Sequence, residues 1–159
     1  MSIEIERKFL LKNDDWRRQV ISHHKITQGY LSTDPHRIVR IRIIEGENSS
    51  SGSARLTIKG AKAGASCPEF EYPIPLEDAQ EMLRLCEVSL SKIRHIVPCQ
   101  NSSLDWEVDV FTGVLSGLIV AEIELPSEDF KIKLPEWIGE EVTTDSAYAN
   151  SNLYKRGSV

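Results

Sequence analysis

The chain opens with a stretch in which charged and apolar residues alternate, Ile3-Glu4-Ile5-Glu6-Arg7-Lys8-Phe9. In a β-strand, side chains at positions i and i+2 share one face, about 6.6 Å apart. One face of this stretch would therefore carry the apolar side chains with Arg7 among them. The other face would carry Glu4, Glu6 and Lys8. The pattern predicts a strand with one strongly charged face.

Similar alternation recurs along the whole chain and decides the fold class. Turn-forming residues separate several of the runs, as in Thr33-Asp34-Pro35 and Thr112-Gly113, and short strands joined this way favour antiparallel structure. We expect one domain over residues 1–159, mainly β (α+β), with eight strands in an antiparallel sheet, barrel or sandwich and a few covering helices; the resemblance described below favours the eight-stranded antiparallel β-barrel. The expected strands are 3–11, 25–32, 37–45, 54–60, 69–74, 90–97, 103–111 and 117–125. The expected helices are 14–24, 76–88, a short turn after Ser127, and a last helix from near Asp145 to before Gly157.

The charged faces are sorted by sign from strand to strand. Acidic pairs fall on the first, fifth, seventh and eighth runs, and basic pairs fall on the third, fourth and sixth. A half-buried antiparallel strand is usually apolar inside and charged outside, which predicts a sandwich with a charged surface. Like charges on one face repel, however. If helices cover the bulky apolar faces, the charged faces instead line a cavity. The pattern alone leaves both arrangements open.

A charged interior needs a ligand that pairs with both its acidic and its basic side chains, because buried charges are costly unless they are paired or bound to ions. Arg and Lys suit phosphate oxygens, and carboxylates suit Mg²⁺ or Mn²⁺. A complex of a metal ion with a polyphosphate satisfies both conditions. The second arrangement therefore predicts a phosphate and metal tunnel.

The composition and the cysteine pattern argue against several classes of protein. The chain is 40% hydrophobic and has a net charge of −5, which argues against non-specific nucleic-acid binding. Cys67, Cys86 and Cys99 are odd in number and lack CxxC spacing, so no disulfide framework or thiolate zinc site is indicated. The charged start lacks a secretory pattern, and no apolar run approaches the roughly 20 residues of a membrane span. We expect a cytoplasmic protein without a membrane partner.

The opening ExExK pattern resembles the signature of the CYTH superfamily, the triphosphate tunnel metalloenzymes. Further segments that resemble the family follow in its order: Gln28-Gly29-Tyr30-Leu31, Val39-Arg40-Ile41-Arg42, Leu56-Thr57-Ile58-Lys59-Gly60, Glu69-Phe70-Glu71-Tyr72, Lys92-Ile93-Arg94, Glu107-Val108-Asp109-Val110-Phe111 and Ala121-Glu122-Ile123-Glu124-Leu125. The similarity spans roughly residues 1–126, and residues 140–155 look like the family's closing region.

The resemblance implies an eight-stranded tunnel that holds a linear triphosphate with Mg²⁺ or Mn²⁺. Carried over by position, the phosphate-binding residues would be Lys8, Arg40, Arg42, Lys59, Lys92 and Arg94. The metal-binding residues would be Glu4, Glu6, Asp109, Glu122 and Glu124, with Glu69 and Glu71 as further candidates. One metal ion would bridge phosphate oxygens, and a second would lower the pKa of a water that attacks the terminal phosphorus.

In similar proteins, a tyrosine and a lysine at the places of Tyr30 and Lys92 have been considered for proton transfer, so both are candidate catalytic residues. A lysine beside other cations can have the lowered pKa that a general base needs. The alternative is that Lys92 only binds phosphate and Tyr30 only packs.

Several functions stay compatible with the resemblance. The leading expectation is metal-dependent hydrolysis of inorganic triphosphate. The enzymatic alternatives are a class IV adenylate cyclase and a thiamine triphosphatase. The alternative of another class is a non-catalytic polyphosphate or nucleotide binder, against which the many inward acids count. Apolar strand faces that helices do not cover would need a partner, so a homodimer is also open.

Overall fold

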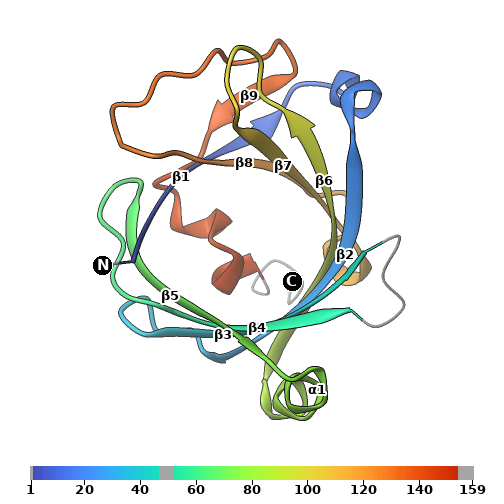
Figure 1. The fold of residues 1–159 in the computed structure, drawn as a ribbon, viewed down its shortest axis with the longest axis vertical. Coiled ribbons are helices and arrows are strands. Elements are labelled where there is room, and N and C mark those ends of the chain that lie inside the picture. The colour runs from blue at the N-terminus through green and yellow to red at the C-terminus, as the bar shows by residue number, and fades with distance from the viewer. Residues whose placement is uncertain (1, 47–51, 154–159) are drawn as a thin grey trace.

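The strands of a computed structural model, which describes residues 2–46 and 52–153, form one closed ring (Figure 1). Every pairing between neighbouring strands is antiparallel, in the order β5-β4-β3-β2-β6-β7-β8-β1 with β5 paired back to β1. The barrel strands are β1 (Ile3–Leu11), β2 (Ser22–Ser32), β3 (Ile38–Gly46), β4 (Ser53–Lys59), β5 (Ser66–Ile74), β6 (Val88–Pro98), β7 (Asp105–Phe111) and β8 (Ile119–Glu124). The predicted eight-stranded antiparallel barrel is confirmed.

A ninth strand, β9 (Ile138–Glu141), lies outside the predicted set. One edge of β1 pairs with β8 through Glu6–Leu10. The other edge is divided, because its first residues pair with β5 and its last residues pair with β9. The strand that opens the chain therefore closes the barrel.

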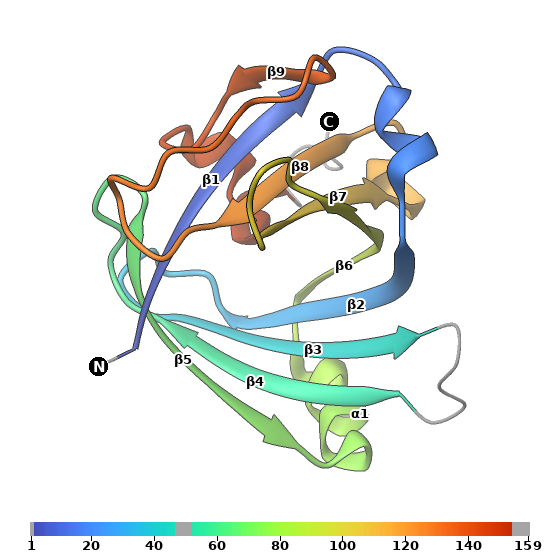
Figure 2. The same ribbon diagram turned by 45° about the horizontal axis from the view of Figure 1, so that its top comes forward.

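The outer wall carries the apolar faces, as the alternation predicts. The helix α1 (Leu76–Leu85) lies outside the barrel beside β3 and β4 (Figure 2) and covers a cluster that includes Ile41, Ala54 and Ala79. Over β1, β7 and β8 the cover is mostly irregular chain. There Trp106 packs edge to face against both Phe9 and Trp137, with ring centroids 5.6 and 5.7 Å apart. Burying aromatic side chains of this size contributes about 2–3 kcal/mol each.

The prediction of a helix over residues 14–24 is wrong in extent. Only Asp15–Gln19 is helical in the range 14–24, as the 3-10 helix η1, and β2 begins at Ser22. Asn13 does accept a hydrogen bond from the amide of Asp15, 2.9 Å long. The turn cannot extend into a longer helix, because β2 pairs along both edges with β3 and β6.

The two other long helices are also shorter in the structure than predicted, whereas the short turn predicted after Ser127 is present. The range 76–88 ends as a helix at Leu85, because β6 begins at Val88. In place of the last predicted helix the structure has the 3-10 helix η3 (Ser146–Tyr148) and a further 3-10 turn at residues 150–153, and the end of the predicted range beyond residue 153 lies outside the described residues. Another 3-10 helix, η2 (Gly113–Leu115), connects β7 to β8.

The C-terminal segment enters the ring of strands. Figure 1 shows residues near η3 inside the barrel. Leu153 is fully buried and packs with Tyr30, Leu90, Phe111 and Val120, all on strands or strand ends of the barrel. This apolar plug fills one part of the interior and leaves the charged part for ligands.

Among residues 2–46 and 52–153, every helix falls short of the length and apolar character needed to cross a lipid bilayer.

Candidate active site

Basic side chains from three strands, β1, β3 and β6, point into the barrel and are nearly removed from solvent. Lys8, Arg40, Arg42, Lys92 and Arg94 are each at most 9% exposed. The alternation that places apolar residues on the outer wall places these cations inside. Lys59 is more open and contacts Glu4 at 2.7 Å and Glu69 at 3.3 Å. The structure thus gathers all six predicted phosphate-binding residues inside one barrel.

The barrel encloses two neighbouring cavities of different character. The large cavity has a volume of about 340 Å³, and the small cavity about 180 Å³. Both are lined by Glu4, Glu6, Arg40, Lys59 and Asn150. The large cavity adds Lys8, Tyr30, Lys62 and residues 142–146 and 149–152. The small cavity adds Arg42, Glu69, Glu71, Arg94, Glu107, Glu122 and Glu124. Carboxylates therefore concentrate toward the small cavity.

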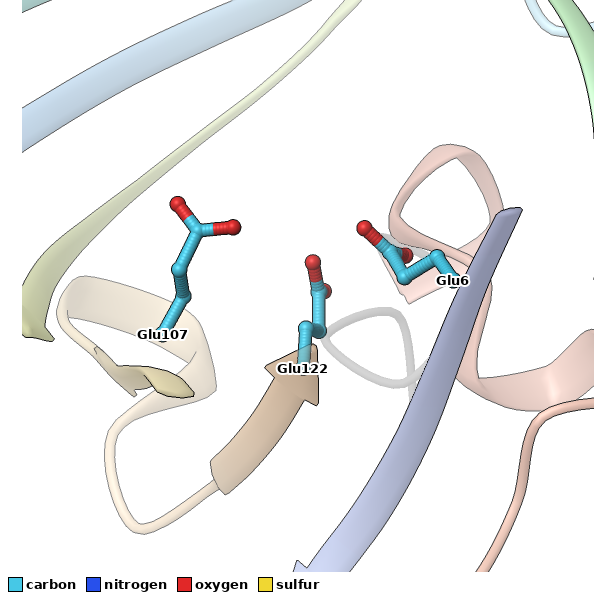
Figure 3. A group of neighbouring side chains, drawn as sticks. All are labelled: Glu6, Glu107 and Glu122. Atoms are coloured by element: carbon cyan, nitrogen blue, oxygen red, sulfur yellow. The ribbon is translucent and has the colours of Figure 1, made fainter. Parts of the chain in front are cut away.

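Three carboxylates form the tightest acidic group among the described residues. Glu6 on β1, Glu107 on β7 and Glu122 on β8 each offer an oxygen within 4.8 Å of the other two (Figure 3). We call them the three-carboxylate cluster. Burial, followed by the charges of Glu122 and Glu4, raises the pKa of Glu6 well above its usual range. A divalent cation would relieve this crowding, and hard carboxylate oxygens are the ligands that Mg²⁺ and Mn²⁺ take. The donor set fits such an ion.

Glu122 is held ionised by the cations around it. Its carboxylate lies 3.4 Å from Lys8 Nζ and 3.5 Å from Arg94 Nη2. Burial alone would raise the pKa of Glu122, but Lys8, Lys92 and Arg94 lower it well below its usual range. Glu122 therefore remains a negatively charged oxygen donor throughout the neutral pH range.

Asp109 and Lys92 lie deeper than the cavities. Asp109 is fully buried, accepts two hydrogen bonds from Arg94 (2.8 and 2.9 Å), and lies 2.6 Å from Lys92 Nζ. Lys92 Nζ, also fully buried, makes this ion-pair contact but finds no hydrogen bond of good geometry among residues 2–46 and 52–153. Burial, with repulsion from Arg94 and Arg42, lowers the pKa of Lys92 to about 8 against the attraction of Asp109. Neither residue lines either cavity.

The remaining predicted metal-binding residues, Glu4, Glu69, Glu71 and Glu124, all line the small cavity. Glu71 contacts Arg40 at 3.4 Å and accepts a hydrogen bond from Thr57, 2.8 Å long. Glu69 contacts Lys59. Partial burial of the Glu124 carboxyl group, together with the charges of Glu4 and Glu69, raises its pKa. These acids lie outside the three-carboxylate cluster, although they share the small cavity with it.

A hydrogen-bonded network supports the inner face of β2. Gln28 is fully buried and accepts hydrogen bonds from Arg42 Nε (3.0 Å) and Nη2 (2.8 Å). Its amide donates to Tyr30 Oη, 2.7 Å away. Tyr30 is 4% exposed and lines the large cavity. The network thus joins a candidate catalytic residue to a candidate phosphate-binding residue.

The C-terminal segment supplies groups that the sequence patterns did not reveal. Lys8 Nζ donates to the carbonyl of Tyr148 at 3.0 Å, and Lys62 Nζ donates to the carbonyl of Thr143 at 2.6 Å. The amide of Asn150 donates to Glu122 at 3.5 Å. No strand alternation marks these residues. Glu107, by contrast, shares a strand face with Asp109, and this spacing could have placed it among the metal candidates.

These features define a class of protein: a closed antiparallel β-tunnel in which buried cations and clustered carboxylates share one lumen. The chain matches the model of the CYTH domain over residues 2–157, so it belongs to the CYTH family. It is 41% identical to an inorganic triphosphatase of Acetivibrio thermocellus, covering 98% of this chain and 95% of the relative. It is 32% identical to an inorganic triphosphatase of Nitrosomonas europaea, covering 94% and 95%.

Solved structures agree with this assignment. The inorganic triphosphatase NE1496 superposes with a TM-score of 0.64 at 31% identity, over 96% of this chain and 95% of the other. A putative adenylyl cyclase from Hippeastrum, described as having a dominant triphosphatase activity, superposes with a TM-score of 0.56 over 80% of both chains. At 14% identity the second likeness shows the fold alone.

Proposed function

We propose that this protein hydrolyses inorganic triphosphate to pyrophosphate and phosphate with Mg²⁺ or Mn²⁺. One observation carries the proposal: five cations that are at most 9% exposed share one closed barrel with the three-carboxylate cluster, and two of them, Lys8 and Arg94, contact its carboxylates. Phosphoryl transfer needs alignment and charge neutralisation more than covalent help. The names of the two relatives, both inorganic triphosphatases, support the same activity.

Each set of residues has its own task in the proposed reaction. Lys8, Arg40, Arg42, Lys59 and Arg94 bind the phosphate oxygens and hold the chain of phosphates straight, because their donors line or border the cavities. Glu6, Glu107 and Glu122 would hold the cation, which would neutralise phosphate charge and lower the pKa of a water bound to it. Hydrolysis joins the oxygen of a water molecule to the terminal phosphorus as the bridging P–O bond breaks. The products are phosphate and pyrophosphate, which between them take up the protons of the water.

Lys92 and Tyr30 take different parts in this proposal. Lys92 is fully buried beside Asp109, so it supports Arg94 and Asp109 and adds positive charge behind the site. Tyr30 lines the large cavity and can reach a ligand there. In this proposal Glu4, Glu69, Glu71 and Asp109 orient the basic side chains that they contact, and Glu124 adds negative charge that attracts metal ions to the small cavity.

Phosphate release from inorganic triphosphate, ATP and thiamine triphosphate tests the proposal, with Mg²⁺, with Mn²⁺ and with a chelator. We expect the fastest release from inorganic triphosphate and none with the chelator. Cyclic AMP formation from ATP would identify an adenylate cyclase instead. Preferred turnover of thiamine triphosphate would identify a thiamine triphosphatase. Tight binding of triphosphate without turnover under either metal would identify a non-catalytic binder.

A further inference from the structure

Gln28 is a buried polar residue that contacts the site without lining it. It lies two residues before Tyr30 on β2, so both side chains point to the inner face of the barrel. The residue between them, Gly29, faces outward, where an added Cβ would meet Cys86 and Leu83 of the α1 region. Gln28 is completely buried, which makes its hydrogen bonds energetically important.

The chemistry of its partners fixes how the Gln28 amide points. A guanidinium group carries only donors, so the two hydrogen bonds from Arg42 must reach the amide oxygen. The amide nitrogen is therefore the atom that faces Tyr30 Oη at 2.7 Å. If the amide were turned over, donors would oppose donors at Arg42.

The same logic then fixes the hydroxyl of Tyr30. An amide nitrogen can only donate, so Tyr30 Oη must act as the acceptor in this hydrogen bond. The hydroxyl proton has to point elsewhere. Within the part of the chain that the structure describes, Tyr30 Oη has no second hydrogen-bond partner. Since Tyr30 lines the large cavity with Lys8 and Arg40, its proton is available to a ligand there.

We propose that Gln28 is a positioning residue that keeps the Tyr30 hydroxyl as a hydrogen-bond donor to a phosphate oxygen in the large cavity, while it braces Arg42. The inference rests on the proposed function and deepens it. It assigns Tyr30 the role of a donor to the substrate rather than that of a proton acceptor. Gln28 acts through two neighbours, and each should affect a different kinetic constant: Tyr30 should affect kcat and Arg42 should affect KM.

The test is a double-mutant cycle with Gln28→Met and Tyr30→Phe on triphosphate hydrolysis. Methionine keeps the length of the side chain and removes all three hydrogen bonds. We expect each single variant to lower kcat about tenfold, the effect of one lost hydrogen bond in the transition state. Adding Gln28→Met to Tyr30→Phe should leave kcat unchanged within about twofold. Gln28→Met should also raise KM, because Arg42 loses its brace. This rise should be the same in the wild-type and Tyr30→Phe backgrounds.

Equal losses of kcat in both backgrounds would overturn the proposal, because Gln28 would then act independently of Tyr30. Gln28→Glu guards against a folding defect in the methionine variant, since a carboxylate still pairs with Arg42 but accepts the proton of Tyr30. Its kcat should be no higher than that of Tyr30→Phe, and a value near the wild type would contradict the assignment. Gln80→Glu and Gln80→Met on the exposed face of α1 are matched controls and should match the wild type.

The outcome also separates this inference from the proposed function. Turnover by the wild-type protein tests the function. If the wild type binds triphosphate without turnover, the function is wrong, and the same cycle is measured on the Kd for triphosphate. Coupling between Gln28 and Tyr30 in Kd would then still support the donor role, and additive effects would overturn it.

Discussion

Glu107 completes the three-carboxylate cluster and also contacts Arg94 at 2.9 Å. We predict that Glu107→Gln weakens Mg²⁺ or Mn²⁺ binding at least about tenfold and lowers kcat, because one charged oxygen donor is lost. A metal titration of hydrolysis rate measures both effects. Asp105→Asn is the matched control, since Asp105 lies two positions earlier on β7 and lines neither cavity. An unchanged metal dependence in Glu107→Gln would remove this residue from the site.

Lys92 tests whether a buried cation is structural. It is fully buried and lies 2.6 Å from Asp109. Lys92→Met removes one of the two cations that pair with Asp109 and leaves Arg94 as the remaining partner. The loss should therefore lie below the roughly 3–5 kcal/mol of a buried pair that is broken completely, at about 1–3 kcal/mol. Urea unfolding measures the change. Lys92→Met with Asp109→Asn should recover part of the loss, and a single variant as stable as the wild type would contradict the structural role.

The residues of the site differ in how far the sequence could predict them. Lys8, Arg40, Arg42 and Arg94 were predictable, because strand alternation alone sends them to one face. Asp109 and Lys92 were placed in the barrel, yet their mutual pairing below the cavities depends on the register between β6 and β7. Asn150 and Lys62 could not be predicted, because they lie on irregular chain that meets the barrel only through long-range contacts.

At the scale of elements, the contact between β2 and α1 depends on a glycine. An added Cβ at Gly29 would come within 2.9 Å of Cys86 Cβ and of Leu83 Cδ2. We predict that Gly29→Ala destabilises the protein by about 1–3 kcal/mol through overpacking. Thermal or urea unfolding measures the loss. Leu83→Ala in the same chain should reduce the additional cost of Gly29→Ala, and purely additive losses would argue against this contact as the cause.

The junction of β1 with β9 predicts a pH effect. Arg7 donates two hydrogen bonds to Glu141, of 3.0 and 2.8 Å, and these lower the pKa of Glu141. A lowered folded-state pKa contributes stability that is present above the ordinary carboxyl value, about 4.3, and is lost as pH falls through the lowered value. The wild type should therefore melt above Glu141→Gln at pH 7, and this difference in Tm should disappear as the pH is lowered to 3. The difference should be small, because the ion pair is partly exposed. A gap that widens in acid would refute this account.

The elements themselves divide into predictable and unpredictable ones for physical reasons. Eight strands were predicted because each has a period of two over several residues. β9 was missed because Ile138–Glu141 is only four residues long and is held by pairing with β1. The range 14–24 looked helical locally, but pairing of β2 with two neighbours outweighs local propensity.

At the scale of the whole molecule, the lumen holds like charges together without a ligand, which costs stability. Burial and two nearby carboxylates raise the pKa of Glu6, so this cost should fall when a cation binds. A cation at about a hundred times its Kd adds about 2.7 kcal/mol to the free energy of unfolding. We predict that Mg²⁺ or Mn²⁺ raises the Tm of the wild type, measured by calorimetry against a chelator.

The same measurement separates the cation site from general salt effects. Glu6→Gln should melt higher than the wild type in chelator and should gain less from the metal. Glu140→Gln removes the same charge from an exposed residue of β9, outside the barrel, and should behave as the wild type. A Glu6→Gln protein with the full metal-induced shift would show that the ion binds elsewhere.

The divided edge of β1 has a consequence for how the protein is made. Among the strands of the barrel, β1 is synthesised before the others, but its partners begin only at Ser66, Ile119 and Ile138. Contacts this distant in sequence form slowly, because the entropy cost of closing a long loop comes before the stabilisation that the contacts provide. Three of the groups that would meet the substrate stay on an unpaired nascent segment until most of the chain has been synthesised. A chain whose synthesis stalls before β8 would therefore have an open barrel with an unpaired edge on β1. Such an edge would mark the truncated product for chaperones and proteases.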